Sequence, residues 1–153
     1  MAATLAVKVE GNPYMDGTGR FKIIGDWVSH TDGTVALGIA STYATSKPFG
    51  DFGPLPKKIL GILKSVETIP GYLGAPATNP PTDQYDITLL DNYSFDVAGG
   101  NLANRSNTVA EKVYPTSDII VDSELTLTIA NAGSGLKGRI ILEFESISSM
   151  YPT

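Results

Sequence analysis

Residues 124–144 read ELTLTIANAGSGLKGRIILEF and give the clearest indication of the fold. Apolar and polar residues alternate in 124–129 and again in 138–144, which is the period of a strand with one buried face. Asn131, Gly133 and Gly135 lie between the two runs and favour a tight reversal of the chain. We therefore predict an antiparallel pair of strands joined by a glycine-rich turn. Its predicted core residues are Leu125, Leu127, Ile129, Ile140, Leu142 and Phe144.

The same alternation recurs earlier in the chain, at residues 4–10, 20–29, 34–41 and 85–90. The pair Asp32–Gly33 separates the second and third of these runs and predicts a hairpin turn, because glycine accepts the positive φ that such turns need. Asp91–Asn92 ends the fourth run as a turn dipeptide.

Residues 57–69 are ambiguous between a helix and a strand. Ile59, Ile62, Leu63 and Val66 fit a helical stripe, whereas Gly61, the β-branched residues and the following turn favour a strand, which we predict. Weaker patterns predict a short strand at 93–97, one helical turn at 102–105 and a short edge strand at 117–121.

These short strands, about seven to nine in number and separated by turn residues without alternating helices, are typical of a sandwich or jelly roll. We predict a single all-β domain over residues 1–153, an antiparallel β-sandwich of jelly-roll type with long loops rich in proline and glycine. The N-terminal third is expected to be its more irregular part.

The composition of the chain argues against several classes of partner and site. The net charge is −5 and the 11 basic residues are scattered, so we expect no nucleic-acid partner, which would need clustered lysine and arginine. The chain has no cysteine, which excludes disulfides, thiolate zinc sites and cysteine nucleophiles. The first ten residues resemble neither a signal peptide nor a membrane anchor, so we expect no membrane partner.

Few residues are candidates for a catalytic or metal-binding site. His30, the sole histidine, lies beside the Asp32–Gly33 turn without an orienting partner, so we interpret it as a turn residue. A cluster of aspartates offers calcium ligands or a hydrolytic carboxylate pair, yet these residues occupy turns and outward strand positions, where solvated aspartate is common. The cluster consists of Asp83, Asp86, Asp91 and Asp96. We predict no enzyme activity, no cofactor, no metal and no small-molecule substrate.

Two long loops are the best candidates for contact with a partner. Residues 42–56 contain three prolines and, with residues 71–82, read as extended surface segments. Exposed apolar side chains on a loop indicate an interface. The predicted interface residues are Tyr43, Phe49, Phe52 and Tyr72, and we expect the chain ends to take part as well.

Four pieces of the sequence resemble a known group of proteins. They are PPTDQYDITLLD at 80–91, DVAGGNLANRS at 96–106, LTLTIANAG at 125–133 and GRIIL at 138–142. Together they resemble small structural proteins encoded among the virion genes of tailed bacteriophages. The resemblance covers roughly the C-terminal half of the chain and contains no catalytic signature.

The resemblance implies a non-enzymatic virion component, and foremost a capsid decoration or cement protein on the capsid surface. Its implied partners are the major capsid protein and copies of itself, in a homotrimer. The alternative is a tail, baseplate or fibre component that binds a receptor or glycan. Either role needs interface area rather than an active site.

Overall fold

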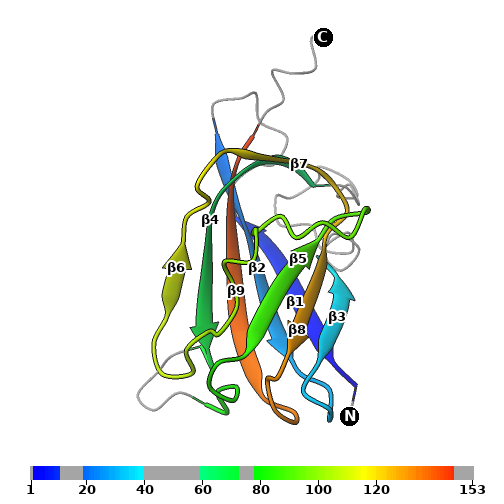
Figure 1. The fold of residues 1–153 in the computed structure, drawn as a ribbon, viewed down its shortest axis with the longest axis vertical. Coiled ribbons are helices and arrows are strands. Elements are labelled where there is room, and N and C mark those ends of the chain that lie inside the picture. The colour runs from blue at the N-terminus through cyan, green and yellow to red at the C-terminus, as the bar shows by residue number, and fades with distance from the viewer. Residues whose placement is uncertain (1, 11–18, 40–58, 73–77, 147–153) are drawn as a thin grey trace.

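The computed structural model describes residues 2–10, 19–39, 59–72 and 78–146. These residues form two antiparallel sheets that pack face to face as a β-sandwich (Figure 1). The predicted all-β sandwich is therefore confirmed. The predicted loop at 42–56 lies outside the described residues, as do residues 73–77 of the second loop and residues 147–153 at the C-terminus.

The larger sheet has the order β1-β2-β9-β4, and two short strands pair with successive parts of the far edge of β4, one after the other. Its strands are β1 (Thr4–Glu10), β2 (Arg20–Val28), β9 (Lys137–Glu145), β4 (Ile59–Pro70), β6 (Glu111–Val113) and β7 (Ile119–Ser123). The smaller sheet has the order β3-β8-β5. Its strands are β3 (Val35–Gly38), β8 (Thr126–Ala130) and β5 (Asp86–Leu90).

The strands pair as nested antiparallel partners. β2 pairs with β9, β3 with β8, and β4 with β7, so the first half of the chain meets the second half in reverse order. The innermost partner of β5 is the irregular segment 96–105, which bridges to β5 at Leu90↔Asp96 and Tyr85↔Arg105. A long hairpin rolled up in this way is the topology of a jelly roll.

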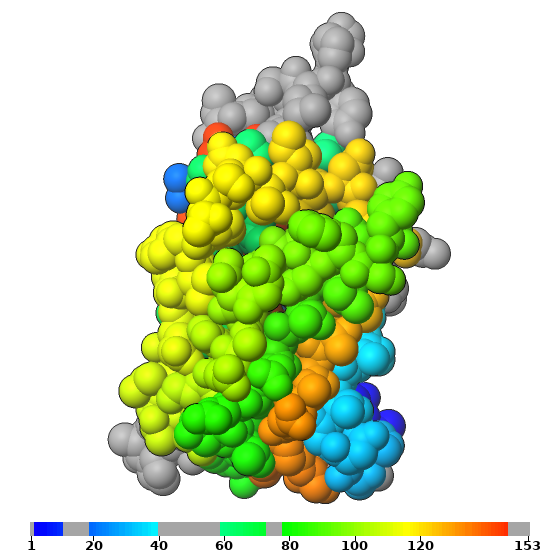
Figure 2. All heavy atoms as spheres, in the orientation of Figure 1, coloured from blue at the N-terminus to red at the C-terminus, as the bar shows by residue number. Residues whose placement is uncertain are grey.

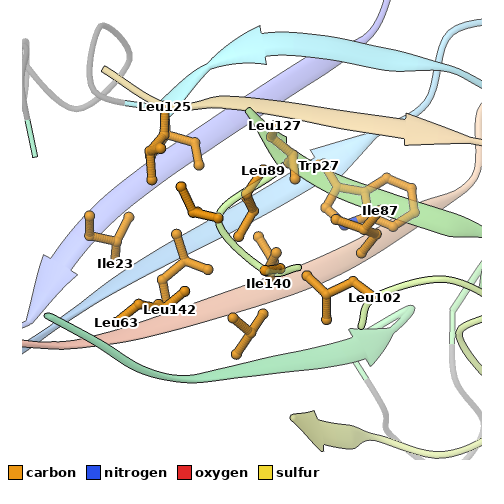
Figure 3. Packing of buried hydrophobic residues seen from close by; sticks show 14 of the residues in the cluster. Ile23, Trp27, Leu63, Ile87, Leu89, Leu102, Leu125, Leu127, Ile140 and Leu142 are labelled. Carbon is orange, nitrogen blue, oxygen red and sulfur yellow. The ribbon is translucent and has the colours of Figure 1, made fainter. Parts of the chain in front are cut away.

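The core lies between the sheets and follows the predicted alternation. All six predicted core residues of 125–144 are at most 1% exposed. They meet residues of the opposite sheet, including Ile23, Leu63 and Leu89 (Figure 3). Trp27 is fully buried in this core, and a Cβ at Gly138 on the neighbouring strand would lie 2.4 Å from its ring. Glycine at 138 is thus required for Trp27 to pack inside.

The prediction that 124–129 and 138–144 form a hairpin is wrong. β8 belongs to the smaller sheet and β9 to the larger one, so residues 131–136 arch across the core from one sheet to the other. The turn residues do reverse the chain, with positive φ at Asn131, Gly133 and Gly135. The arch lets the apolar faces of the two strands meet across the core, whereas a hairpin would place both on the same side.

The hairpin predicted at Asp32–Gly33 is wrong for the same reason. The tight turn exists, because the amide of His30 donates to the carbonyl of Thr34 at 2.9 Å and Gly33 has a φ of 84°. However, β2 pairs with β1 and β9, whereas β3 pairs with β8. The two arches also bond to each other, since Ala132 donates its amide to the carbonyl of Gly33.

The other strand predictions have mixed outcomes. In the ambiguous stretch 57–69, residues 59–69 form a strand as predicted, while 57 and 58 lie outside the described residues. This strand, β4, is the longest in the described structure. The predicted edge strand at 117–121 is present as β7, two residues later. The predicted strand at 93–97 and helical turn at 102–105 are wrong, because both stretches belong to the irregular segment beside β5. The three-residue strand β6 was not predicted.

Candidate interaction site

The clustered aspartates hold the irregular segment 91–110 in place. One carboxylate oxygen of Asp96 accepts hydrogen bonds from the amides of Leu89 and Ala98, at 3.1 and 3.0 Å, and the other from Gly100 at 2.9 Å. Asp91 accepts from the amides of Tyr93 and Phe95, at 2.8 and 3.0 Å. Each carboxylate therefore closes a turn by satisfying backbone donors.

The other two aspartates tie the same segment to its surroundings. Asp86 accepts from the amide of Asn104 at 2.9 Å and from the side-chain amide of Asn131 at 2.8 Å. Asp83 accepts from the amide of Asn107 at 3.1 Å. Within the described ranges, no three acidic or histidine side chains gather as metal ligands.

His30 has the environment of a turn residue. Its Nδ1 accepts from the backbone amide of Asp32 at 3.3 Å, and its side chain is 45% exposed. Hydrogen bonds from the hydroxyl and the amide of Thr34 lower the pKa of the Asp32 carboxyl. These contacts stabilise the reversal between β2 and β3.

The tip of the irregular segment presents two aromatic side chains to solvent. Tyr93 is 90% exposed and Phe95 is 55% exposed, although the backbone around them is fixed by Asp91. The amide of Asn92 donates to the hydroxyl of Ser123 at 2.9 Å, which anchors the tip to the end of β7. An exposed aromatic pair on a backbone held in this way can bind a partner without the cost of ordering the loop.

A small hollow adjoins the tip. It has a volume of about 50 Å³, and Phe95, Val97, Pro115 and Ile119 are among the residues that line it. Such a volume suits a single inserted side chain rather than a drug-sized ligand. The green-to-yellow part of the chain, which includes the tip, covers much of the face seen in Figure 2. We call Tyr93, Phe95 and this hollow the aromatic tip.

Tyr72 follows β4 at the other end of the sandwich, with a φ of 53°. Its ring centroid lies 4.6 Å from Nζ of Lys137 and 4.7 Å from Cζ of Arg139, which places two cations against the ring. Arg139 is also paired with Asp26 through two hydrogen bonds of 2.6 and 3.0 Å, which raise the pKa of its guanidinium. Burial raises the pKa of the Tyr72 hydroxyl.

Of the four predicted interface residues, the described structure includes only Tyr72. Tyr43, Phe49 and Phe52 lie outside the described residues, and Tyr72 is half-buried within its cluster of cations. The aromatic tip was missed because Tyr93 was assigned to a strand, where large aromatics are usually core residues. The turn signal Asp91–Asn92 just before it was the clue that its side chain points outward.

A buried tyrosine lies under the irregular segment. Tyr85 is fully buried, and desolvation raises the pKa of its hydroxyl to about 12. The nearby Thr68 hydroxyl acts in the opposite direction on this pKa, but neither hydroxyl makes a hydrogen bond of ordinary geometry. The ring packs at 5.7 Å from Trp27, so its role is to fill the core.

No protein family model, curated protein or solved structure gives a significant match to the chain. Within the described part, no helix combines the length and the apolar character needed to cross a membrane.

Proposed function

We propose that the chain is a non-enzymatic structural protein of a phage virion, most specifically a capsid decoration or cement protein that binds and stabilises the head. Its partners in this proposal are the major capsid protein and further copies of the chain, in a homotrimer on the capsid surface. The sequence resemblance to virion proteins motivates the proposal.

One observation carries it: three of the four resembling pieces are hydrogen-bonded to one another. The fourth, 138–142, contributes Ile140 and Leu142 to the same core. The amide of Thr82 donates to the carbonyl of Ala132 at 2.8 Å, which joins 80–91 to 125–133. The amide of Gln84 donates to the carbonyl of Arg105 at 2.9 Å, which joins 80–91 to 96–106. Pieces that are scattered in sequence but bonded in space are expected of a shared structural framework, rather than of chance similarity.

The use of the aspartates supports a structural role. Asp86 and Asp91 face backbone and amide donors of their own chain, so their acceptor positions are occupied by turns. A hydrolase built on this pair predicts that Asp86→Asn and Asp91→Asn abolish any hydrolytic activity detected. Unchanged activity in both variants removes that alternative.

We propose that the aromatic tip is part of the surface that meets the capsid, because exposed aromatic side chains are typical anchors of interfaces. The loop with Tyr43, Phe49 and Phe52 is the second proposed contact, and Tyr72 the third.

The direct test is mass spectrometry of purified particles of the phage that encodes the chain. A decoration protein should be present in copy numbers comparable to those of the major capsid protein. Presence at only a few copies per particle would reject the decoration role and place the chain in the tail or fibre class.

The second candidate is a tail, baseplate or fibre component that binds a receptor or glycan. The exposed ring of Tyr93 favours it, since flat aromatic rings stack on the apolar faces of sugars. Reproducible hits on a glycan array that disappear in Tyr93→Ser would support this role. An array without hits, together with a high copy number in the particle, would favour decoration.

A further inference from the structure

The edges of the two sheets differ in how they are protected. An open strand edge is a template for pairing with another strand, and proteins usually shorten, cover or interrupt such edges. The segment 96–105 covers β5, while β3 has four residues, β6 three and β7 five. β1 has seven residues, and among the described residues it pairs only with β2.

β1 lacks a proline, a bulge and an inward charge, although Lys8 and Glu10 are charged residues on its outer face. It contains no proline, and its register with β2 runs from Thr4↔Val28 to Glu10↔Lys22 without a bulge. Its inward side chains are Leu5, Val7 and Val9, none of them charged. Val7 faces the sandwich interior but stays half-buried rather than buried, so a strand alongside β1 would cover it further.

The sequence of β1 is complementary to itself in the antiparallel sense. In the register centred on Val7, all seven residues pair, with Leu5 opposite Val9 on the inner face. On the outer face Ala6 lies opposite Lys8 and Thr4 opposite Glu10, so no like charges are directly opposed. Nζ of Lys8 also lies 3.8 Å from Oε1 of Glu10 in the same strand, and this carboxylate offsets the charge of the lysine. The register centred on Lys8 would oppose the two lysines.

We propose that the edge of β1 pairs with β1 of a second copy of this chain, in the antiparallel register centred on Val7. The contact joins the larger sheets of two copies into one continuous sheet about a twofold axis. The inference rests on β1 alone and not on the proposed virion role. A threefold contact elsewhere on the chain would neither require nor prevent it.

A cysteine cross-link tests the register, because the natural chain contains no cysteine. In Val7→Cys the two thiols face each other across the twofold axis, and oxidation should give a covalent dimer. Thr4→Cys is the matched control in the same strand: its thiol lies six residues along from its copy, at roughly 20 Å. Equal cross-linking of both variants, or none in Val7→Cys, would overturn the proposal.

Charge at position 6 tests the same contact without a covalent bond. Ala6 is exposed, and the twofold axis of the proposed dimer creates two pairs in which Ala6 of one copy lies opposite Lys8 of the other. Ala6→Glu should therefore strengthen the dimer, and Ala6→Lys should weaken it. Each change is expected to shift the dimer dissociation constant by about 2- to 30-fold in opposite directions, measured by sedimentation equilibrium. If neither substitution changes the dissociation constant, the chain does not associate through β1, and the proposal that a second copy pairs with this edge is wrong.

Discussion

The strand edges at β5 and β1 differ in whether another described segment of the chain covers them. At β5 the chain folds its own irregular segment 96–105 onto the strand and fixes it with the carboxylates of Asp86 and Asp96. At β1 the edge is a regular strand with one partner in the described structure. Covering an edge within one chain therefore requires many specific side-chain contacts, whereas an uncovered edge requires only alternating residues and is available for pairing.

The largest expected effect comes from the hydrophobic anchor of the covered edge. Leu102 is fully buried although it lies in an irregular segment, so Leu102→Ala should cost roughly 2–5 kcal/mol, as much as Leu127→Ala or Ile140→Ala in the central strands. Urea unfolding followed by circular dichroism measures all three. A cost for Leu102→Ala far below that of the other two would mean that the segment is only a surface cover, and unchanged stability in Leu127→Ala and Ile140→Ala would contradict the core itself.

A smaller effect is expected at the carboxylate that fixes the covered edge. Asp96→Ala leaves the amides of Leu89, Ala98 and Gly100 without their acceptor and should cost about 1–3 kcal/mol. Hydrogen exchange should show faster exchange at residues 96–105 while β1 and β2 are unaffected. The control is Glu124→Ala, an exposed carboxylate outside the segment, which should leave both stability and exchange unchanged.

Removing the buried hydroxyl of Tyr85, beneath the covered edge, should have a smaller effect on the free energy of unfolding at neutral pH. Because the Tyr85 hydroxyl lacks a good hydrogen bond, Tyr85→Phe should change stability by less than about 1 kcal/mol at pH 7, and can raise it. The folded-state pKa is raised from 10.0 to about 12, so the contribution of Tyr85 is fully present below pH 10 and is lost as the pH rises towards 12.

Comparison of the wild-type chain with Tyr85→Phe isolates the pH dependence that comes from this hydroxyl. By pH 11 the wild-type chain should lose about 1 kcal/mol relative to Tyr85→Phe, because the unfolded tyrosine ionises and the buried one does not. Urea titrations of both chains at pH 7, 10 and 11 measure the difference. Parallel stability curves over this range would mean that the hydroxyl reaches solvent.

The smallest effect is expected at the aromatic tip. Tyr93 is 90% exposed, so Tyr93→Ser should alter the free energy of unfolding by no more than about 0.5 kcal/mol. The same variant should weaken binding to purified capsids if the tip contacts them. A loss of stability instead would place Tyr93 among the residues that hold the covered edge.

Much of the framework could be predicted from the sequence because burial on one face imposes a period of two. That period identified the strands at 4–10, 20–29 and 85–90 and the inward positions of 125–144. At 57–69 the apolar spacing fitted a helix, and it was Gly61, the β-branched residues and the following turn that favoured the strand now seen from Ile59. The candidate site was predicted poorly, because exposed aromatics and core aromatics look alike until the turn at Asp91 is known to bend the chain outward.

Local patterns in the sequence were enough to identify the inward residues of 125–144 and the reversals of the chain at 30–34 and 131–136. Whether these reversals are arches between the sheets or hairpins within one sheet depended on the tertiary fold. The physical reason is that alternation and turn residues act locally and are the same in both cases. The choice depends on which strand offers its edge and which apolar face lies opposite, and those are properties of the whole fold.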